Sequence, residues 1–254
     1  MPERTDHAAG TPSWVDIGTD VEGAKSFYTG LLGWETQDAG PPEETGGYGF
    51  FMKGGRMVAG YGPQQNPGPP AWAVYIAVDD ADAVAKRIED AGGKAVAGPM
   101  DVMAAGRMAV CQDAEGAFIS LWQAGEHKGA GLTGEAGSMT WVELNSRNVD
   151  AAKRFYPQVF GWEPVTHEGP MEYTEFMSGG QAVAGMMAMA PMVPAEVPPY
   201  WMVYFGTDDV DASVDKAGGL GAEILVPASD IPGGGRFAVL RDPQGAVFGL
   251  HRAG

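Results

Sequence analysis

The chain is poor in cysteine and in basic residues and has no long apolar run, and each shortage excludes a class of protein. Its one cysteine, Cys111, excludes an internal disulfide and a thiolate metal cluster, and it favours a cytoplasmic location. Only 16 basic residues face 33 acidic ones, and the resulting net charge of −17 opposes binding to nucleic acid or to an anionic membrane. No stretch reaches the roughly 18 apolar residues of a membrane span, and the first residues are polar rather than signal-like.

The chain does contain an internal repeat: one sequence pattern occurs twice. Residues 14–17 (WVDI) correspond to 141–144 (WVEL), and the later segments of the two copies match in the same order. The matching pairs are 24–28 with 152–156, 33–35 with 161–163, 70–75 with 199–204, 106–110 with 235–239, and 113–116 with 242–245. The spacing stays between 125 and 129 residues throughout. One architectural unit is therefore duplicated, and two similar pockets are expected.

The duplication divides the chain into domains. Residues 1–12 form an arm, 13–123 the first domain, 124–138 a linker rich in small residues, and 139–254 the second domain. At 254 residues, each domain is long enough to bury its own core. We expect the two copies to pack as an internal pseudo-dimer, so that the chain works as a monomer with further association left open.

Each copy divides again into two modules of the same order. Hydrophobic periodicity in the first copy predicts a strand at 14–18, a helix at 21–32, and strands at 47–53 and 56–61. After a proline-rich break it predicts a strand at 72–78, a helix at 81–91, and strands at 94–99, 107–112 and 118–123. The fold class is thus α+β, built from four βαβββ modules. One helix for several strands covers only one sheet face, so the other face is free to line a cavity.

This order and its motifs resemble the vicinal oxygen chelate superfamily of glyoxalase I, extradiol dioxygenases and the fosfomycin and bleomycin resistance proteins. The specific parts are Phe27-Tyr28 before Gly33-Trp34, Phe155-Tyr156 before Gly161-Trp162, and the Asp-x-x-Gly turns before the final strands. The residues 10–16 and the ending Trp122-Gln123 look like the two-domain actinobacterial members, often labelled hydroxylase or glyoxalase-like. The resemblance implies two tandem glyoxalase/bleomycin-resistance-type domains.

The resemblance also implies a divalent metal, held by His, Glu or Gln on the first and last strand of each module. None of the corresponding positions carries a usual metal ligand: they fall on Ser13 or Trp14, Ala59 or Gly60, Ala73, Ser120, Thr140 or Trp141, Ala184 or Gly185, Met202 and Gly249. His7, His127 and His167 are expected at the surface, and His251 stands alone on a final strand. We therefore expect no metal and no cofactor.

Strand alternation sorts the remaining side chains between the two sheet faces. Val15 and Ile17 should pack on the helix, which leaves Trp14 and Asp16 on the open face, unless the register shifts by one residue. The expected ligand-binding residues are Trp14, Tyr75, Trp122, Trp141, Asn145, Tyr204 and His251, and the expected catalytic residues are Asp16 and Glu143. The aromatic residues could instead only close the core, and each carboxylate could pair with Arg107 or Arg236.

Three functions are compatible with these residues. The first is metal-independent binding, including sequestration, of a small aromatic or polycyclic molecule by aromatic walls with polar anchors. The second is a glyoxalase-like lyase, isomerase or hydroxylase-type enzyme in which Asp16 or Glu143 is a general base with a pKa raised by desolvation. The third is a scaffold surface for a protein partner.

Overall fold

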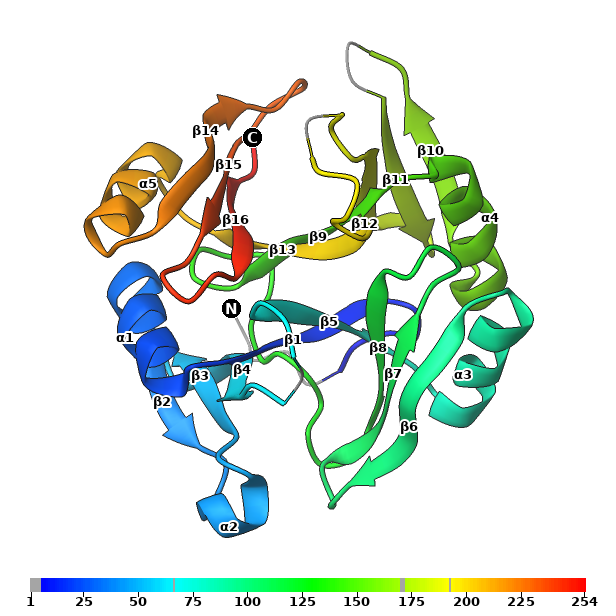
Figure 1. The fold of residues 1–254 in the computed structure, drawn as a ribbon, viewed down its shortest axis with the longest axis horizontal. Helices are drawn as coiled ribbons and strands as arrows, with labels where there is room; N and C mark the ends of the chain where they lie inside the picture. Colours follow the sequence, from blue (N-terminus) through cyan, green and yellow to red (C-terminus); the bar gives the residue numbers. More distant parts are fainter. Residues whose placement is uncertain (1–5, 66, 170–171, 192) are drawn as a thin grey trace.

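The computed structural model describes residues 6–65, 67–169, 172–191 and 193–254. Within these residues the chain forms two eight-stranded sheets, one from each copy of the repeat (Figure 1). Two tandem domains of mixed α+β class confirm the fold predicted from the sequence. No helix in the described ranges is both long and apolar enough to cross a bilayer.

The described residues of the first copy form eight strands and three helices. The strands are β1 (Pro12–Thr19), β2 (Glu35–Asp38), β3 (Gly49–Lys53), β4 (Arg56–Pro63), β5 (Ala71–Ala77), β6 (Lys94–Val102), β7 (Gly106–Gln112) and β8 (Phe118–Ala124). The helices are α1 (Val21–Leu32), α2 (Pro42–Thr45) and α3 (Ala81–Asp90). Strand β2 was not predicted, because all four of its residues are exposed and it lacks the apolar alternation that marks a half-buried strand.

The second copy repeats this order. Its strands are β9 (Met139–Ser146), β10 (Glu163–His167), β11 (Tyr173–Ser178), β12 (Gln181–Ala188), β13 (Tyr200–Gly206), β14 (Glu223–Asp230), β15 (Arg236–Arg241) and β16 (Val247–Arg252). Its helices are α4 (Val149–Phe160) and α5 (Val210–Gly219).

Each sheet joins two modules through their first strands. The order is β2-β3-β4-β1-β5-β8-β7-β6 in the first sheet and β10-β11-β12-β9-β13-β16-β15-β14 in the second. Strand β1 runs parallel to β4 and antiparallel to β5, with Trp14 opposite Tyr75 and Asp16 opposite Ala73. The opening strand of each module therefore lies near the centre of its sheet.

Local sequence signals fix where the helices begin and end. Helix α1 ends at Gly33, whose positive φ of 65° is a conformation that glycine adopts without steric cost. Helices α3 and α5 begin after the paired aspartates of the repeat, where Asp80 accepts a hydrogen bond from the backbone of Ala83 and Asp209 one from Ala212.

The helix-side faces of the two sheets share one core. A single buried cluster contains Val15, Ile17 and Phe27 of the first copy together with Val142, Phe205 and Phe248 of the second. In Figure 1, helices α1 and α5 lie side by side on one flank and α3 and α4 on the other, with the central strands of both sheets between them. Each domain is long enough to bury a core of its own, but the two share one, because one helix per module leaves apolar sheet surface that the other copy covers.

Two reciprocal hydrogen bonds tie the copies together inside this core. The hydroxyl of Tyr28 donates to Asp242 Oδ2 at 2.9 Å and accepts from Trp72 Nε1 at 2.9 Å. In the same way Tyr156 donates to Asp113 Oδ2 at 2.8 Å and accepts from Trp201. The helix tyrosine of each copy thus reaches the Asp-x-x-Gly turn of the other, and these two recurring motifs hold the internal pseudo-dimer.

Replacing Tyr28 by phenylalanine should lower the free energy of unfolding by about 1–3 kcal/mol, because a buried carboxylate oxygen and the indole of Trp72 both lose their partner. Tyr156→Phe should cost a similar amount. Urea denaturation of each variant measures the change.

The control is Tyr61→Phe, since the Tyr61 hydroxyl donates to the exposed carboxylate of Asp38, which can bind water instead. Its effect should stay below about 0.5 kcal/mol. If Tyr28→Phe proved as stable as the wild type, the cross-copy bond would contribute nothing to holding the domains together.

Candidate functional site

The first sheet carries a buried carboxylate held by two phenols, on the face away from the helices. Tyr48 and Tyr75 both donate to Asp16 Oδ2, each at 3.0 Å. Trp14 Nε1 donates in turn to the Tyr48 hydroxyl at 3.0 Å. The four side chains come from β1, from β5 and from the residue before β3. The site therefore depends on the pairing of strands that are distant in sequence.

The second sheet repeats this arrangement with a longer acid. Tyr173 donates to Glu143 Oε2 at 3.0 Å and Tyr204 to Oε1 at 3.1 Å, while Trp141 Nε1 donates to the Tyr173 hydroxyl at 2.8 Å. Each copy thus has one hydrogen-bonded chain from a tryptophan through a tyrosine to a carboxylate. The second differs from the first because the two phenols bind different carboxylate oxygens.

The structure places the opening strand in the register that the alternation predicted. Val15 and Ile17 belong to the core shared with the helices. Trp14 lies in a separate cluster with Tyr75 and Trp122, which we call the first aromatic face. The counterpart with Met202, Tyr204 and the half-buried Trp141 is the second aromatic face.

Burial controls the electrostatics of both carboxylates. Removal from water raises the pKa of Asp16 to about 6, against the opposing effect of the hydrogen bonds from Tyr48 and Tyr75. Burial also raises the pKa of Glu143, although its tyrosine partners and Asn145 lower it. The pKa values of Tyr48, Tyr75 and Tyr204 rise well above the usual range, first through burial and then through the nearby acid. The phenols therefore remain protonated and serve as donors.

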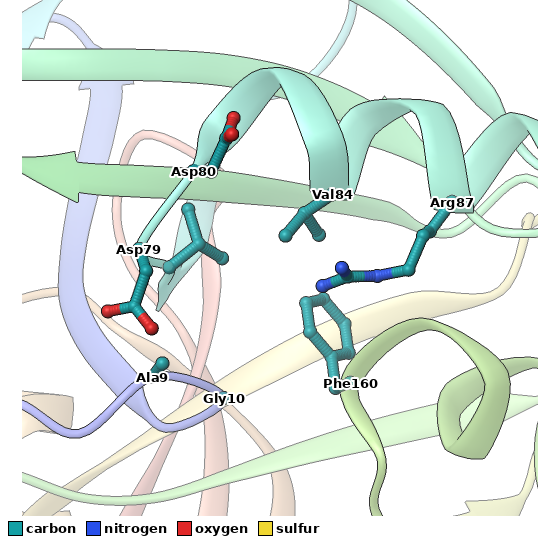
Figure 2. A pocket seen from close by; sticks show the side chains of 8 residues that line it. Ala9, Gly10, Asp79, Asp80, Val84, Arg87 and Phe160 are labelled. Atoms are coloured by element: carbon teal, nitrogen blue, oxygen red, sulfur yellow. The ribbon is translucent and has the colours of Figure 1, made fainter.

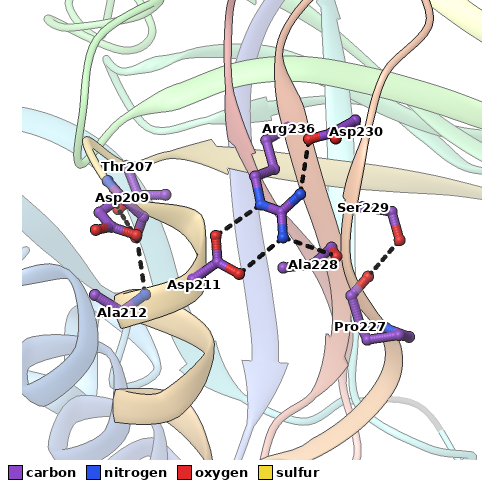
Figure 3. A network of polar contacts seen from close by, with 9 residues as sticks. All are labelled: Thr207, Asp209, Asp211, Ala212, Pro227, Ala228, Ser229, Asp230 and Arg236. Carbon is purple, nitrogen blue, oxygen red and sulfur yellow. Dashed lines mark hydrogen bonds and ion pairs between the residues drawn. The ribbon is translucent and has the colours of Figure 1, made fainter.

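Neither carboxylate pairs with Arg107 or Arg236, so that alternative was wrong. Arg107 binds Asp82 at 2.7 Å and Asp101 at 2.8 Å, and both acids are largely exposed. Arg236 does the same in the second copy with Asp211 and Asp230 (Figure 3). The two arginines lie at equivalent positions of the repeat, and each pairs with one acid at the start of a helix and one on an edge strand. The buried acids Asp16 and Glu143 instead accept hydrogen bonds from neutral phenols.

Tyr48 and Tyr173 are site residues that the sequence analysis missed. Tyr48 lies one residue before β3 and Tyr173 is the first residue of β11, so neither belongs to the strands whose alternation was used to choose site residues. The repeat contains a signal that could have found them, because residues 48 and 173 are 125 apart, the same separation as between Gly60 and Gly185 on the neighbouring strands. An aromatic residue kept at both positions indicates a shared role.

The other expected ligand-binding residues lie on the aromatic faces with different partners. Trp122 donates through Nε1 to the backbone oxygen of His127 at 2.9 Å. His251 is half-buried, its Nδ1 lies 3.2 Å from the Thr140 hydroxyl, and burial lowers its pKa. Asn145 is buried next to Glu143. The expectation of a surface position was correct for His167, but wrong for His7, which is buried, and for His127, which is half-buried.

The family's metal ion does not fit the side chains on these faces. A side chain on Gly60 or Gly185 would collide with the hydroxyl of Tyr48 or Tyr173, since an added Cβ would lie 2.0 Å or 1.8 Å from it. An added Cβ on Gly249 would meet the ring of Tyr204 at 2.0 Å. Phenol groups thus occupy the space that ligand side chains would need. Among the described residues, no three His, Cys, Asp or Glu side chains are grouped to hold a metal.

Two cavities lie beside the N-terminal arm and not over the carboxylates. One of about 190 Å³ is bordered by Gly10, by Asp79 and Arg87 near α3, and by Phe160 at the end of α4 (Figure 2). A second, of about 560 Å³, is bordered by His7, Trp122 and Lys128. Only Trp122 is shared with an aromatic face, so these cavities do not define the candidate site.

Comparison with known protein families places the chain in one of them. The Glyoxalase/Bleomycin resistance protein/Dioxygenase superfamily matches it twice, over residues 14–121 and 138–250. The chain belongs to this superfamily, as the resemblance implied.

Several relatives resemble the chain over nearly its whole length. It is 41% identical to "Putative glyoxylase CFP32" of Mycobacterium bovis, over 98% of this chain and 97% of that one. It is 40% identical to the anthracycline biosynthesis protein DnrV of Streptomyces peucetius, over 97% and 94%.

Solved structures share the fold at much lower identity. The Mn(II)-bound glyoxalase of Novosphingobium aromaticivorans has a TM-score of 0.66 at 18% identity, covering 96% of this chain and 82% of its own. The 2,3-dioxygenase LapB of Pseudomonas sp. KL28 has a TM-score of 0.68 at 12% identity, covering 99% and 94%.

The raised pKa of Asp16 predicts a pH-dependent stability. The folded protein holds this proton more tightly than the unfolded chain, so the contribution of Asp16 is full below pH about 4 and is lost as the pH rises through about 6. Relative to Asp16→Asn, the free energy of unfolding of the wild type should fall by about 2–3 kcal/mol between those limits. Urea denaturation across this pH range measures it.

Glu143→Gln should reveal a decline of the same sign, because burial raises that pKa too. Parallel pH curves for the wild type and Asp16→Asn would contradict the burial of a titrating carboxyl at this position.

Proposed function

We propose that the chain binds a small polycyclic aromatic molecule on its aromatic sheet faces without the help of a metal ion, in a single chain whose two domains (13–123 and 139–254) replace a dimer. The observation that carries this proposal is the buried carboxylate surrounded by tryptophan and tyrosine rings in each copy. Aromatic walls stack on a flat molecule, and a few polar groups orient it.

Two further observations support an aromatic ligand. A relative that is 40% identical over 97% of this chain bears the name of an anthracycline biosynthesis protein, and anthracyclines are hydroxylated polycyclic aromatic molecules. The carboxylates accept hydrogen bonds from phenol groups of the protein itself, so a phenolic ligand would offer the same donor. A protein that binds such a molecule without turning it over would sequester it.

Titration with the anthracycline doxorubicin should quench tryptophan fluorescence saturably and return the drug unchanged. Addition of a chelator should leave the Kd unaltered, since no metal takes part. Because doxorubicin is a cation and the chain carries a net charge of −17, the titration is repeated at high salt and with a neutral hydroxyanthraquinone. Quenching that salt abolishes, with no response to the neutral compound, would contradict the proposal.

The alternative function is that of a glyoxalase-like lyase, isomerase or hydroxylase-type enzyme. The observation that favours it is the raised pKa of both buried carboxyls, with that of Asp16 at about 6, because a general base works best near the operating pH. The 41% identity to a relative named as a glyoxylase agrees with this alternative.

Purified protein is assayed with methylglyoxal plus thiols, and separately with hydroxylated aromatic compounds, with and without added metal. If the enzyme hypothesis is correct, turnover should fall by about 10²–10⁴-fold in Asp16→Asn or Glu143→Gln, because a general base contributes that much. The Asp38→Asn variant serves as control, since Asp38 also accepts a phenol hydrogen bond but is exposed. Turnover that survives both substitutions would exclude these acids as the base.

A further inference from the structure

The two aromatic faces differ in what lies over them. The linker crosses the first face and is bonded to its strands, because Ala130 N donates to Ser13 O and Gly131 N to Met57 O, each at 2.8 Å. Trp122 holds the same stretch through the backbone oxygen of His127. We call residues 126–131 the linker cover.

The His127 ring sits among the aromatic side chains of the first face. Its centroid lies 4.5 Å from that of Trp14, 5.5 Å from Trp122 and 5.8 Å from Phe50. Both ring nitrogens are buried, and neither finds a hydrogen-bond partner within the described part of the chain. Burial lowers the pKa of His127 to about 4, so the ring is neutral at neutral pH. The ring is edge-on to Trp14 and Trp122, and as a neutral group enclosed by aromatic side chains it fills space on this face that a ligand would need.

The exposure of the matched tryptophans reflects this cover. Trp14 is only 3% exposed, whereas its counterpart Trp141 is half-buried. The positions of the two indoles in their strands are equivalent, and each donates to a tyrosine of the same network. The first face is therefore the more closed of the two.

The second face also carries polar groups that the first lacks. Asn145 and Tyr200 stand where the first copy has Gly18 and Ala71, and they lie opposite each other across β9 and β13. The Asn145 amide lies close enough to Glu143 to lower the pKa of that carboxyl, but its Nδ2 is buried and makes no hydrogen bond of normal geometry to another described residue. A buried amide donor without a well-formed hydrogen bond is costly, which makes it a natural partner for a ligand acceptor. Tyr200 lies close enough to Glu143 for that charge to raise its pKa, after the larger effect of burial.

We infer that the second face is the ligand site and that the linker cover, through His127, is a built-in occupant of the first. The inference rests on the proposed function and deepens it. Asn145 Nδ2 donates to a ligand carbonyl, and Glu143 accepts from a neighbouring ligand hydroxyl, since each carboxylate oxygen has accepted only one phenol. The ligand class is a polycyclic aromatic ketone or quinone that bears a hydroxyl beside its carbonyl, bound once per chain.

The test is a doxorubicin titration with stoichiometry from native mass spectrometry. The wild type should bind one molecule. Asn145→Gly, which gives the second face the residue of the first, and Glu143→Gln should each weaken the Kd about tenfold or more through the loss of a buried hydrogen bond. Asp38→Asn, outside both faces, is the control and should leave the Kd within about twofold.

His127→Gly should open the first face and raise the stoichiometry toward two. Because Trp122 bonds to the backbone of residue 127, the glycine variant retains that contact. Hydrogen exchange gives a readout without ligand, since the amides of Ala130 and Gly131 should exchange slowly in the wild type.

The outcomes separate this inference from the proposed function. Two equivalent sites in the wild type, an unchanged Kd in Asn145→Gly, or fast exchange at Ala130 and Gly131 would overturn the inference and leave aromatic binding intact. Absence of binding by the wild type and every variant would overturn both.

Discussion

The structure depends on the burial of the helix-side faces of two sheets against each other. One helix per module cannot cover four strands, so each copy leaves apolar surface that the other copy must hide. Tyr28 and Tyr156 stabilise that contact from opposite sides, because each gives its hydroxyl to a turn aspartate of the other domain. The Phe-Tyr pairs of α1 and α4 recur together with the Asp-x-x-Gly turns because the tyrosine of one copy bonds to the aspartate of the other.

This shared core leaves the outward faces free to differ. In both copies a tryptophan, two tyrosines and one acid form the same hydrogen-bonded chain on β1 or β9. Neutral phenols satisfy an acid that burial would otherwise disfavour, and this allows a carboxyl to remain inside an aromatic cluster. Gly60 and Gly185 leave room for the hydroxyls of Tyr48 and Tyr173, because a side chain at either glycine would collide with them.

Because the chain is duplicated, the residues of the two aromatic faces can be compared position by position. Position for position, the second face has a longer acid, an asparagine and an additional tyrosine, whereas the first has a linker histidine against its tryptophans. Both faces are built on strands whose other side packs into one shared core, so the same core carries two faces that differ in their side chains.

The sequence by itself determined the repeat, the module order, the family and the sheet face of Trp14, Asp16, Trp141 and Glu143. These follow from local patterns, because successive side chains of a strand point to opposite faces of the sheet and an amphipathic helix has one apolar stripe. Strand β2 was missed since exposed residues carry no such pattern. Only the tertiary structure decided that the domains share a core, that tyrosines rather than Arg107 or Arg236 hold the acids, and that His127 lies over Trp14. Each of these contacts joins segments that are far apart in the chain. Local periodicity shows which face of an element is buried, but it does not show which distant side chain packs against that face.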